Sequence, residues 1–160
     1  SFLGHDDHGT VQTTLAKQLA LYVTLYSPLQ MAADLPESYE RHLDAFQFIK
    51  DVAVDWHKSV YLEAEPGDYI TIARQEKGGD RWFVGSITDE NARTALVDFS
   101  FLPEGTKYEA TIYADAKDAH YQSNPTAYVI TKKVVTNKTK LKQYCAPSGG
   151  FAISVVPIKK

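Results

Sequence analysis

A long apolar segment near the start of the chain constrains the fold most. It covers residues 13–34 and reads TTLAKQLALYVTLYSPLQMAAD. Leu15, Leu19 and Tyr22 recur at helical spacing, while alanine, leucine and valine fill the other faces, so the predicted helix is apolar most of the way round. Such a helix needs partners on several sides, and the rest of the sequence predicts too few elements to cover it. We therefore expect this chain to be one end of a larger protein.

Composition excludes two classes of partner. The 160 residues are 44% hydrophobic and 23% charged, ordinary values for a soluble globular protein of one domain, or of one domain with a fragment of another. The net charge of -3 is spread along the chain and leaves no basic stripe for a nucleic acid. The apolar run stops at Pro28, short of the roughly 20 residues that a membrane span needs, and the polar opening lacks a signal-peptide pattern. The single Cys145 cannot form an internal disulfide.

Helical patterns continue to about residue 55. Thr13 or Thr14 is the expected N-cap of the first helix. Ser27-Pro28 predicts a restart, because serine caps a helix and proline fits its first turn. A third helical segment is predicted over residues 37–55, with apolar residues at three- and four-residue steps that include Leu43 and Phe46.

After Trp56 the hydrophobic period becomes alternating. Eight short strands are predicted, over residues 60–65, 69–74, 82–88, 93–99, 108–113, 128–135, 140–144 and 151–156. Turn residues separate them and no helix intervenes, which is typical of an antiparallel β-sandwich or barrel. The predicted fold class is therefore mainly β with N-terminal helices. We divide the chain into a helical part, residues 1–56, and a β-sandwich domain, residues 57–160; the helices would suit the outside of an incomplete (β/α)8 barrel.

The opening loop is one candidate site. His5, Asp6, Asp7 and His8 could ligate a metal, but contiguous side chains on a loop seldom converge on one ion. A solvated loop is the favoured interpretation, and we predict no metal ligand in this chain.

Two pairs of carboxylates were weighed for chemistry. Glu63 and Glu65 share a strand face and could form the acid and base of a glycosidase, but a turn follows them and decoration of a sheet edge is favoured. Asp115 and Asp118 could hold calcium, but their loop lacks a glycine hinge and a distal glutamate, so a surface loop is favoured. We predict no catalytic residue.

The aromatic residues allow two interpretations. Exposed rings on a β-sandwich could stack on sugar faces, whereas rings that alternate inward would supply the core. The core interpretation is favoured for the candidates, of which Trp82 is the foremost for substrate binding. The rings are those of Trp82, Tyr108, Tyr113, Tyr121 and Tyr128.

Rare strings in the sequence carry a family resemblance. Residues 44–56, DAFQFIKDVAVDW, and residues 82–93, WFVGSITDENAR, closely resemble the C-terminal end of glycoside hydrolase family 97, bacterial α-glucosidases and α-galactosidases. The resemblance implies an N-terminal β-sandwich, a central (β/α)8 barrel with the active site, and a C-terminal β-sandwich. It also implies a catalytic carboxylate pair and a calcium ion held by glutamates, all upstream of Ser1, in a periplasmic or secreted parent. No cofactor is expected in this chain.

The resulting hypothesis is a structural role. The chain would support the upstream catalytic domain, which acts on an α-linked oligosaccharide, and could form a homo-oligomer. The loop from His5 to His8 would then lie towards the mouth of the barrel, near substrate. The alternative is a carbohydrate-binding β-sandwich module; an autonomous enzyme is a third hypothesis. The sequence leaves open glucosidase or galactosidase, and inversion or retention.

Overall fold

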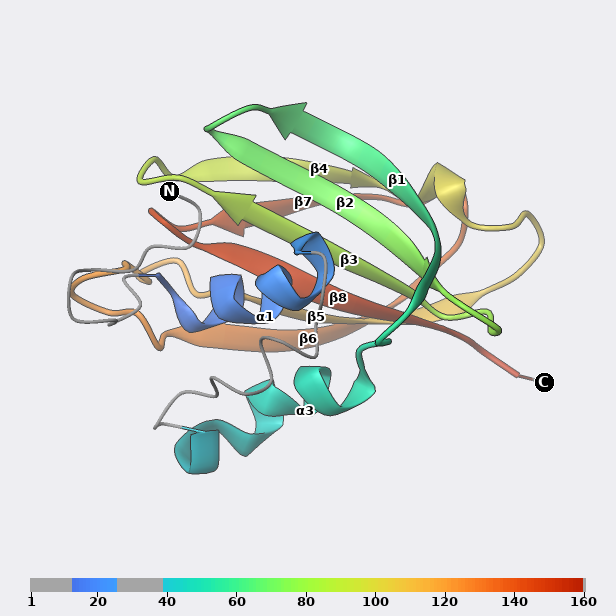
Figure 1. Cartoon of the computed structure of the whole chain (residues 1–160), viewed down its shortest axis with the longest axis horizontal. Helices are drawn as coiled ribbons and strands as arrows, with labels where there is room; N and C mark the ends of the chain where they lie inside the picture. The colour runs from blue at the N-terminus through green and yellow to red at the C-terminus, as the bar shows by residue number, and fades with distance from the viewer. Residues whose placement is uncertain (1–12, 26–38, 160) are drawn as a thin grey trace.

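A six-stranded antiparallel sheet forms the centre of the molecule (Figure 1). The computed structural model describes residues 13–25 and 39–159. The strand order is β1-β2-β3-β8-β5-β6, and β4 pairs with β7 in a separate two-stranded sheet. The strands are β1 (Trp56–Glu65), β2 (Tyr69–Glu76), β3 (Trp82–Thr88), β4 (Arg93–Asp98), β5 (Tyr108–Asp115), β6 (Tyr128–Val135), β7 (Lys140–Cys145) and β8 (Gly150–Pro157). All eight predicted strands and the mainly-β class are confirmed.

Two strands are longer than predicted, because their pairing continues into polar residues beyond the apolar alternation. β1 begins at Trp56 rather than residue 60, and two register irregularities along it allow the longer pairing with β2. β5 continues beyond Tyr113 to Asp115, a residue predicted to lie in a loop. Apolar alternation predicts only the apolar part of a strand, so its polar end is missed.

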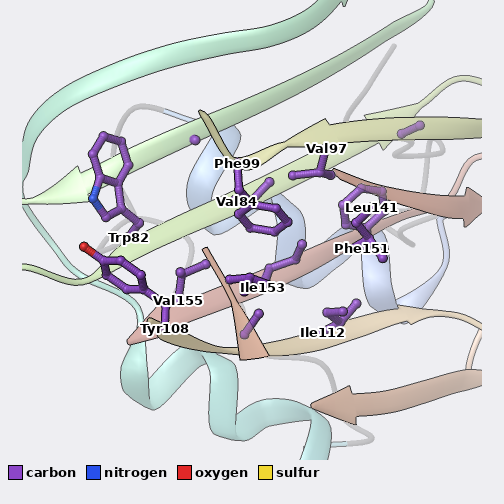
Figure 2. Packing of buried hydrophobic residues seen from close by; sticks show 14 of the residues in the cluster. Trp82, Val84, Val97, Phe99, Tyr108, Ile112, Leu141, Phe151, Ile153 and Val155 are labelled. Carbon is purple, nitrogen blue, oxygen red and sulfur yellow. The ribbon is translucent and has the colours of Figure 1, made fainter. Parts of the chain in front are cut away.

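The largest group of buried apolar residues fills the space between the two sheets. Alternation along β3 directs Trp82 and Val84 towards β4 and β7, and Phe83 and Ile87 towards the opposite face. Figure 2 shows Trp82 beside Tyr108 at one end of this core, and Phe151 near Leu141 at the other. The core residues shown there come from strands of both sheets and from Phe99 in the 3-10 turn η2 (Phe99–Phe101).

Helix α1 (Leu15–Thr24) lies across the opposite face of the large sheet (Figure 1). Thr14 is its N-cap, and the Thr14 hydroxyl accepts a hydrogen bond from the Lys17 amide at 3.2 Å. The helix crosses above Gly85, where a Cβ atom would lie 2.8 Å from the Ala20 carbonyl oxygen. The approach is this close because residue 85 has no side chain.

The expectation that this helix would lack cover is wrong for its described part. Leu19 is 1% exposed and Leu21 5%, although they lie on different faces of the helix. The buried residues of α1 are Leu15, Ala16, Lys17, Leu19, Ala20, Leu21, Tyr22 and Val23. The α1 residues Leu15, Leu19 and Val23 share a core with α3 residues as well as with residues of the sheet, so the cover comes from more than one side.

The third predicted helical segment is shorter than expected. It comprises a 3-10 turn, η1 (Tyr39–His42), and helix α3 (Leu43–Asp51). Phe48 packs edge-on against Phe83 and Tyr113, with ring centroids 5.9 and 5.5 Å apart. Leu43, assigned to the apolar face by spacing, is 53% exposed. The prediction for Leu43 is wrong, because the helix turns its Ala45, Phe46 and Phe48 side towards the sheet.

Two sequence predictions lie beyond this description. The helix predicted to restart at Ser27-Pro28 falls outside the described residues. The assignment of the helices to a (β/α)8 barrel stays a prediction. Within residues 13–25 and 39–159, no helix combines the length and the hydropathy needed to cross a membrane.

Candidate functional site

Glu63 and Glu65 lie on β1, an edge strand of the large sheet. The Glu63 carboxylate accepts hydrogen bonds from the Arg93 guanidinium at 3.3 Å and from the Leu96 amide at 3.1 Å, and so joins β1 to β4. Glu65 is exposed at the end of β1, an edge strand of the large sheet. The interpretation as sheet-edge residues is therefore confirmed.

The leading aromatic candidates belong to the cores. Trp82 is 1% exposed, and its ring centroid lies 4.8 Å from that of Phe101. Tyr108 and Tyr113 are also buried. The core interpretation is confirmed for these three, and Trp82 as a sugar-binding surface is wrong because its ring faces the inside of the sandwich (Figure 2).

The other aromatic candidates are half-buried. Tyr128 donates a hydrogen bond to Asp44, and the Tyr121 ring stacks on that of His120 with centroids 4.7 Å apart. Among side chains whose exposure is described, Tyr61 is the one exposed Phe, Trp or Tyr ring, and it lies on β1. A single ring on an edge strand is not the flat platform that the alternative hypothesis requires.

The opening loop cannot be assessed from this structure. His5, Asp6, Asp7 and His8 lie outside the described residues. In the part of the chain that is described, no group of three or more His, Cys, Asp and Glu side chains is arranged to hold a metal ion.

Asp115 has a role that neither sequence interpretation predicted. It is the last residue of β5 and only 2% exposed, so both the surface-loop and the calcium-loop interpretations are wrong for it. One carboxylate oxygen, Oδ2, accepts hydrogen bonds from the amides of Ala146 and Gly150, both at 2.8 Å. Asp118 lies in the loop that follows, where its carbonyl accepts a hydrogen bond from Asn124 at 3.1 Å. Asp115 thus organises the turn between β7 and β8.

Burial sets the ionisation of Asp115. Removal from water raises the pKa of its carboxyl group to about 6, against hydrogen bonds from Thr14, Ala146 and Gly150 and the charge of Lys17, which lower it. The carboxylate is therefore ionised at neutral pH although it is nearly inaccessible to water.

Lys17 is the second buried charge. It is 0% exposed, and its ammonium group donates to the Thr88 carbonyl at 3.0 Å and to the Ser148 hydroxyl at 3.4 Å. Burial lowers its pKa to about 8, while Asp89, Asp115 and Glu90 oppose that change. In the sequence, Lys17 is one polar interruption of the apolar segment over residues 13–34. Lys17 is the one charged residue of α1, and a single charge in an apolar helix indicates a buried partner.

Ser148 accepts a hydrogen bond from Lys17 and lies in the β7-β8 turn whose amides bind Asp115. It is the one non-glycine residue with a positive φ in the described chain, at 49°. Its carbonyl accepts from the Thr14 amide at 3.2 Å, and its own amide donates to the Asp89 carbonyl at 2.6 Å. A Cβ atom on the next residue, Gly149, would lie 2.0 Å from Asp115 Oδ2. We call Thr14, Lys17, Asp115 and Ser148 the polar cluster.

Two shallow surface hollows complete the survey. The larger, about 330 Å³, lies between the end of α3 and the β2-β3 turn. Its Arg81 is already paired with Glu76 at 2.9 Å; burial acts to raise the pKa of Glu76, but hydrogen bonds from Arg81 hold it below its usual value. The smaller, about 230 Å³, contains Asp89 and Arg93.

The fold and its contacts define a class of protein: an antiparallel β-sandwich domain with a helical layer joined to it by buried polar groups. A family model described as "Glycosyl-hydrolase 97 C-terminal, oligomerisation" matches residues 55–156. The chain therefore belongs to glycoside hydrolase family 97 and contains its C-terminal oligomerisation domain.

Relatives and solved structures agree with this membership. A retaining alpha-galactosidase of Bacteroides thetaiotaomicron is 39% identical over 90% of this chain, and a probable retaining alpha-galactosidase of Streptomyces bingchenggensis is 34% identical over 86%. The chain spans only 21% and 20% of those proteins.

The structural likeness reaches beyond the sandwich. A family 97 enzyme from Pseudoalteromonas sp. strain K8, solved with acarbose, matches with a TM-score of 0.87 and 43% identity over 94% of this chain and 24% of its own. A match over that share of the chain cannot be confined to residues 55–156, so it includes part of the helical layer.

Proposed function

We propose that this chain is the C-terminal portion of a glycosidase, where it supports an upstream catalytic domain and joins subunits. The observation that carries the proposal is the family-model match over residues 55–156, which names oligomerisation. The described carboxylates agree with it, since Glu63 and Asp115 are hydrogen-bonded within the fold rather than facing a cleft. Catalysis would then reside in a barrel upstream of these residues.

The reaction of the parent is proposed from its relatives. Two are named retaining or probable retaining alpha-galactosidases, and the solved Pseudoalteromonas enzyme binds acarbose. We infer hydrolysis of an α-linked galactoside or glucoside oligosaccharide. A retaining reaction would use two upstream carboxyl groups about 5 Å apart, one as nucleophile and one as acid and then base.

One experiment tests whether catalysis resides upstream of this chain. Hydrolysis of p-nitrophenyl α-galactoside and α-glucoside is measured with this chain alone and with the chain extended upstream through a complete barrel. We expect activity only in the extended protein. Hydrolysis by the chain alone would contradict the proposal and direct attention to the loop from His5 to His8.

Association is tested on the same samples. Sedimentation velocity at rising protein concentration should show that the chain alone self-associates. A chain that stays monomeric throughout, while the extended protein oligomerises, would place the subunit contact outside these residues. Calorimetric titration with α-linked oligosaccharides should give no heat of binding; binding that Tyr61→Ala abolishes would favour the carbohydrate-binding alternative.

Two further properties of the parent follow from the family resemblance. We propose that calcium acts in the upstream barrel, where glutamates would hold it; a chelator should then abolish hydrolysis by the extended protein and leave the melting temperature of this chain unchanged. We also propose a periplasmic or secreted location, which cell fractionation of the host would test.

A further inference from the structure

Apolar packing alone gives α1 little reason to occupy one position on the sheet. Leu15, Leu19 and Val23 are nearly or fully buried, as are alanine and leucine residues on the other faces. Hydrophobic contacts are non-directional, so a helix that is apolar on all sides could rotate or slide with little loss of burial. Directional contacts are therefore needed beside the close approach at Gly85 to select the observed position.

Such contacts gather at the beginning of the helix. The amides of Thr14 and Leu15 donate to the carbonyls of Ser148 and Pro125, at 3.2 and 2.7 Å, which satisfies two groups that a helix start leaves without partners. Lys17 then reaches the Thr88 carbonyl at the end of β3. The first turn of α1 thus contacts three separate connections of the sandwich.

Lys17 and Asp115 depend on each other. A buried charge is strongly unfavourable unless another charge and hydrogen bonds compensate it. The other acidic groups that act on Lys17 are Asp89 and Glu90 in the β3-β4 turn. Unlike those residues, Asp115 is itself buried, and Lys17 is the cation that acts on it.

Asp115 also shapes the surface that receives the helix. Its two amide contacts fold the β7-β8 turn around the carboxylate, and Gly149 leaves no room for a side chain there. The turn presents Ser148 in a strained conformation, with its carbonyl on Thr14 and its hydroxyl on Lys17. The hydrogen bonds of Ser148 to Thr14, Asp89 and Lys17 hold its backbone at this positive φ.

We propose that the polar cluster is a register latch: Lys17 and Asp115, which both bind the β7-β8 turn, fix α1 in one position on the six-stranded sheet. Buried ion pairs often contribute little net stability, and their best-attested use is to select one arrangement among several. The latch holds the first turn of α1 at a defined place on the sheet. It concerns this chain's own fold, so it can hold whether or not the proposed glycosidase assignment does.

A double-substitution cycle in the 160-residue chain tests the coupling. Lys17→Met and Asp115→Asn each remove one of the two buried charges that act on each other, so each should raise the hydrogen-exchange rates of residues 18–24 by about tenfold or more. The double variant should show much less than the product of the two single effects. Effects that simply multiply would overturn the latch.

A second measurement distinguishes register from general stability. In ¹H–¹⁵N spectra the wild-type α1 amides should give one set of resonances, whereas the double variant should keep the sheet resonances but show several sets for α1. A double variant with a single, unchanged set would overturn the proposal. The matched control is the exposed pair Lys132 and Glu109, 3.6 Å apart on β6 and β5; Lys132→Met and Glu109→Gln should leave α1 exchange within about twofold.

The wild-type chain supplies a test that does not depend on any variant folding. Amides of residues 18–21 should be protected to within about tenfold of those in the centre of β8, since a latched helix opens only with the sheet. Protection weaker by about a hundredfold or more would overturn the latch. A single variant that fails to fold, beside a double variant that folds, would support it.

Discussion

The two faces of the six-stranded sheet are covered in different ways. On the face towards β4 and β7, alternating side chains such as Val84, Phe151 and Ile153 form an apolar core. On the other face, α1 and α3 supply the cover, and the interface contains aromatic pairs, a close helix approach at Gly85 and the polar cluster. One face is specified by sheet pairing, and the other by individual contacts.

This difference predicts how substitutions on each face should destabilise the domain. Strand register on the sandwich side is fixed by backbone hydrogen bonds, so every apolar side chain there has a determined neighbour. The position of a helix on a sheet has no such ladder. Losses on the sandwich side should therefore unfold the domain, whereas losses on the helical side should first release or displace a helix.

The largest effect is expected for Trp82→Ala. The substitution removes a fully buried ring from the sandwich core and should lower the free energy of unfolding by about 3–5 kcal/mol. Urea denaturation followed by circular dichroism measures it, with Tyr61→Ala, 65% exposed in the wild type, as the control. A small change for Trp82→Ala would mean that this core is loosely packed and would remove the contrast between the faces.

The helical face should carry a pH dependence at Asp115. Burial raises the pKa of this carboxyl from 3.8 to about 6, so between those values the folded chain retains a proton that the unfolded chain has released. The stabilisation is complete below about pH 4 and is lost as the pH rises through 6. Relative to Asp115→Asn, the wild type should lose up to about 3 kcal/mol over that interval. Parallel profiles for the two proteins would contradict this.

Lys17 should act at alkaline pH in the opposite sense. Its pKa is lowered from 10.5 to about 8, so its contribution is complete above about 10.5 and is lost as the pH falls through 8. Denaturation at pH 8 and pH 10, compared with Lys17→Met, measures it; the wild type should gain about 2 kcal/mol relative to the variant. A wild-type gain no larger than that of the variant would show that Lys17 is hydrated.

Gly85→Ala should displace α1 at a smaller cost of about 1–3 kcal/mol. The new methyl group would lie 2.8 Å from both the Ala20 carbonyl oxygen and the Val23 Cβ atom, and backbone cannot move aside as a flexible side chain can. Hydrogen exchange should rise in α1 more than in β3. Gly79→Ala is the control, because its methyl group meets the Glu76 side chain and no atom of α1, so it should leave exchange in α1 unchanged. Equal exchange in α1 and β3 would mean that the helix and sheet open together.

The smallest effect is expected at the exposed pair of Lys132 and Glu109. Lys132→Ala should change the free energy of unfolding by less than about 0.5 kcal/mol, since both side chains are more than half exposed. Urea denaturation at low and high salt measures it. A larger effect that persists in high salt would indicate that this end of β6 packs against something, such as a second copy of the chain.

The sequence by itself determined the sandwich. Alternating apolar residues separated by turns located all eight strands, because a period of two requires no knowledge of distant neighbours. The same pattern predicted Trp82, Tyr108 and Tyr113 as core residues. The family followed from rare strings rather than from physical periodicity.

Only the tertiary structure decided how the helical face is built. Lys17 is hydrogen-bonded to Ser148, 131 residues further along the chain. Asp115 accepts a hydrogen bond from Ala146, 31 residues further along. Asp115 was expected in a surface loop, because the sequence does not show which distant amides its carboxylate will meet. Two buried charges become neighbours only when segments far apart in the chain pack together, and that packing is a property of the folded chain.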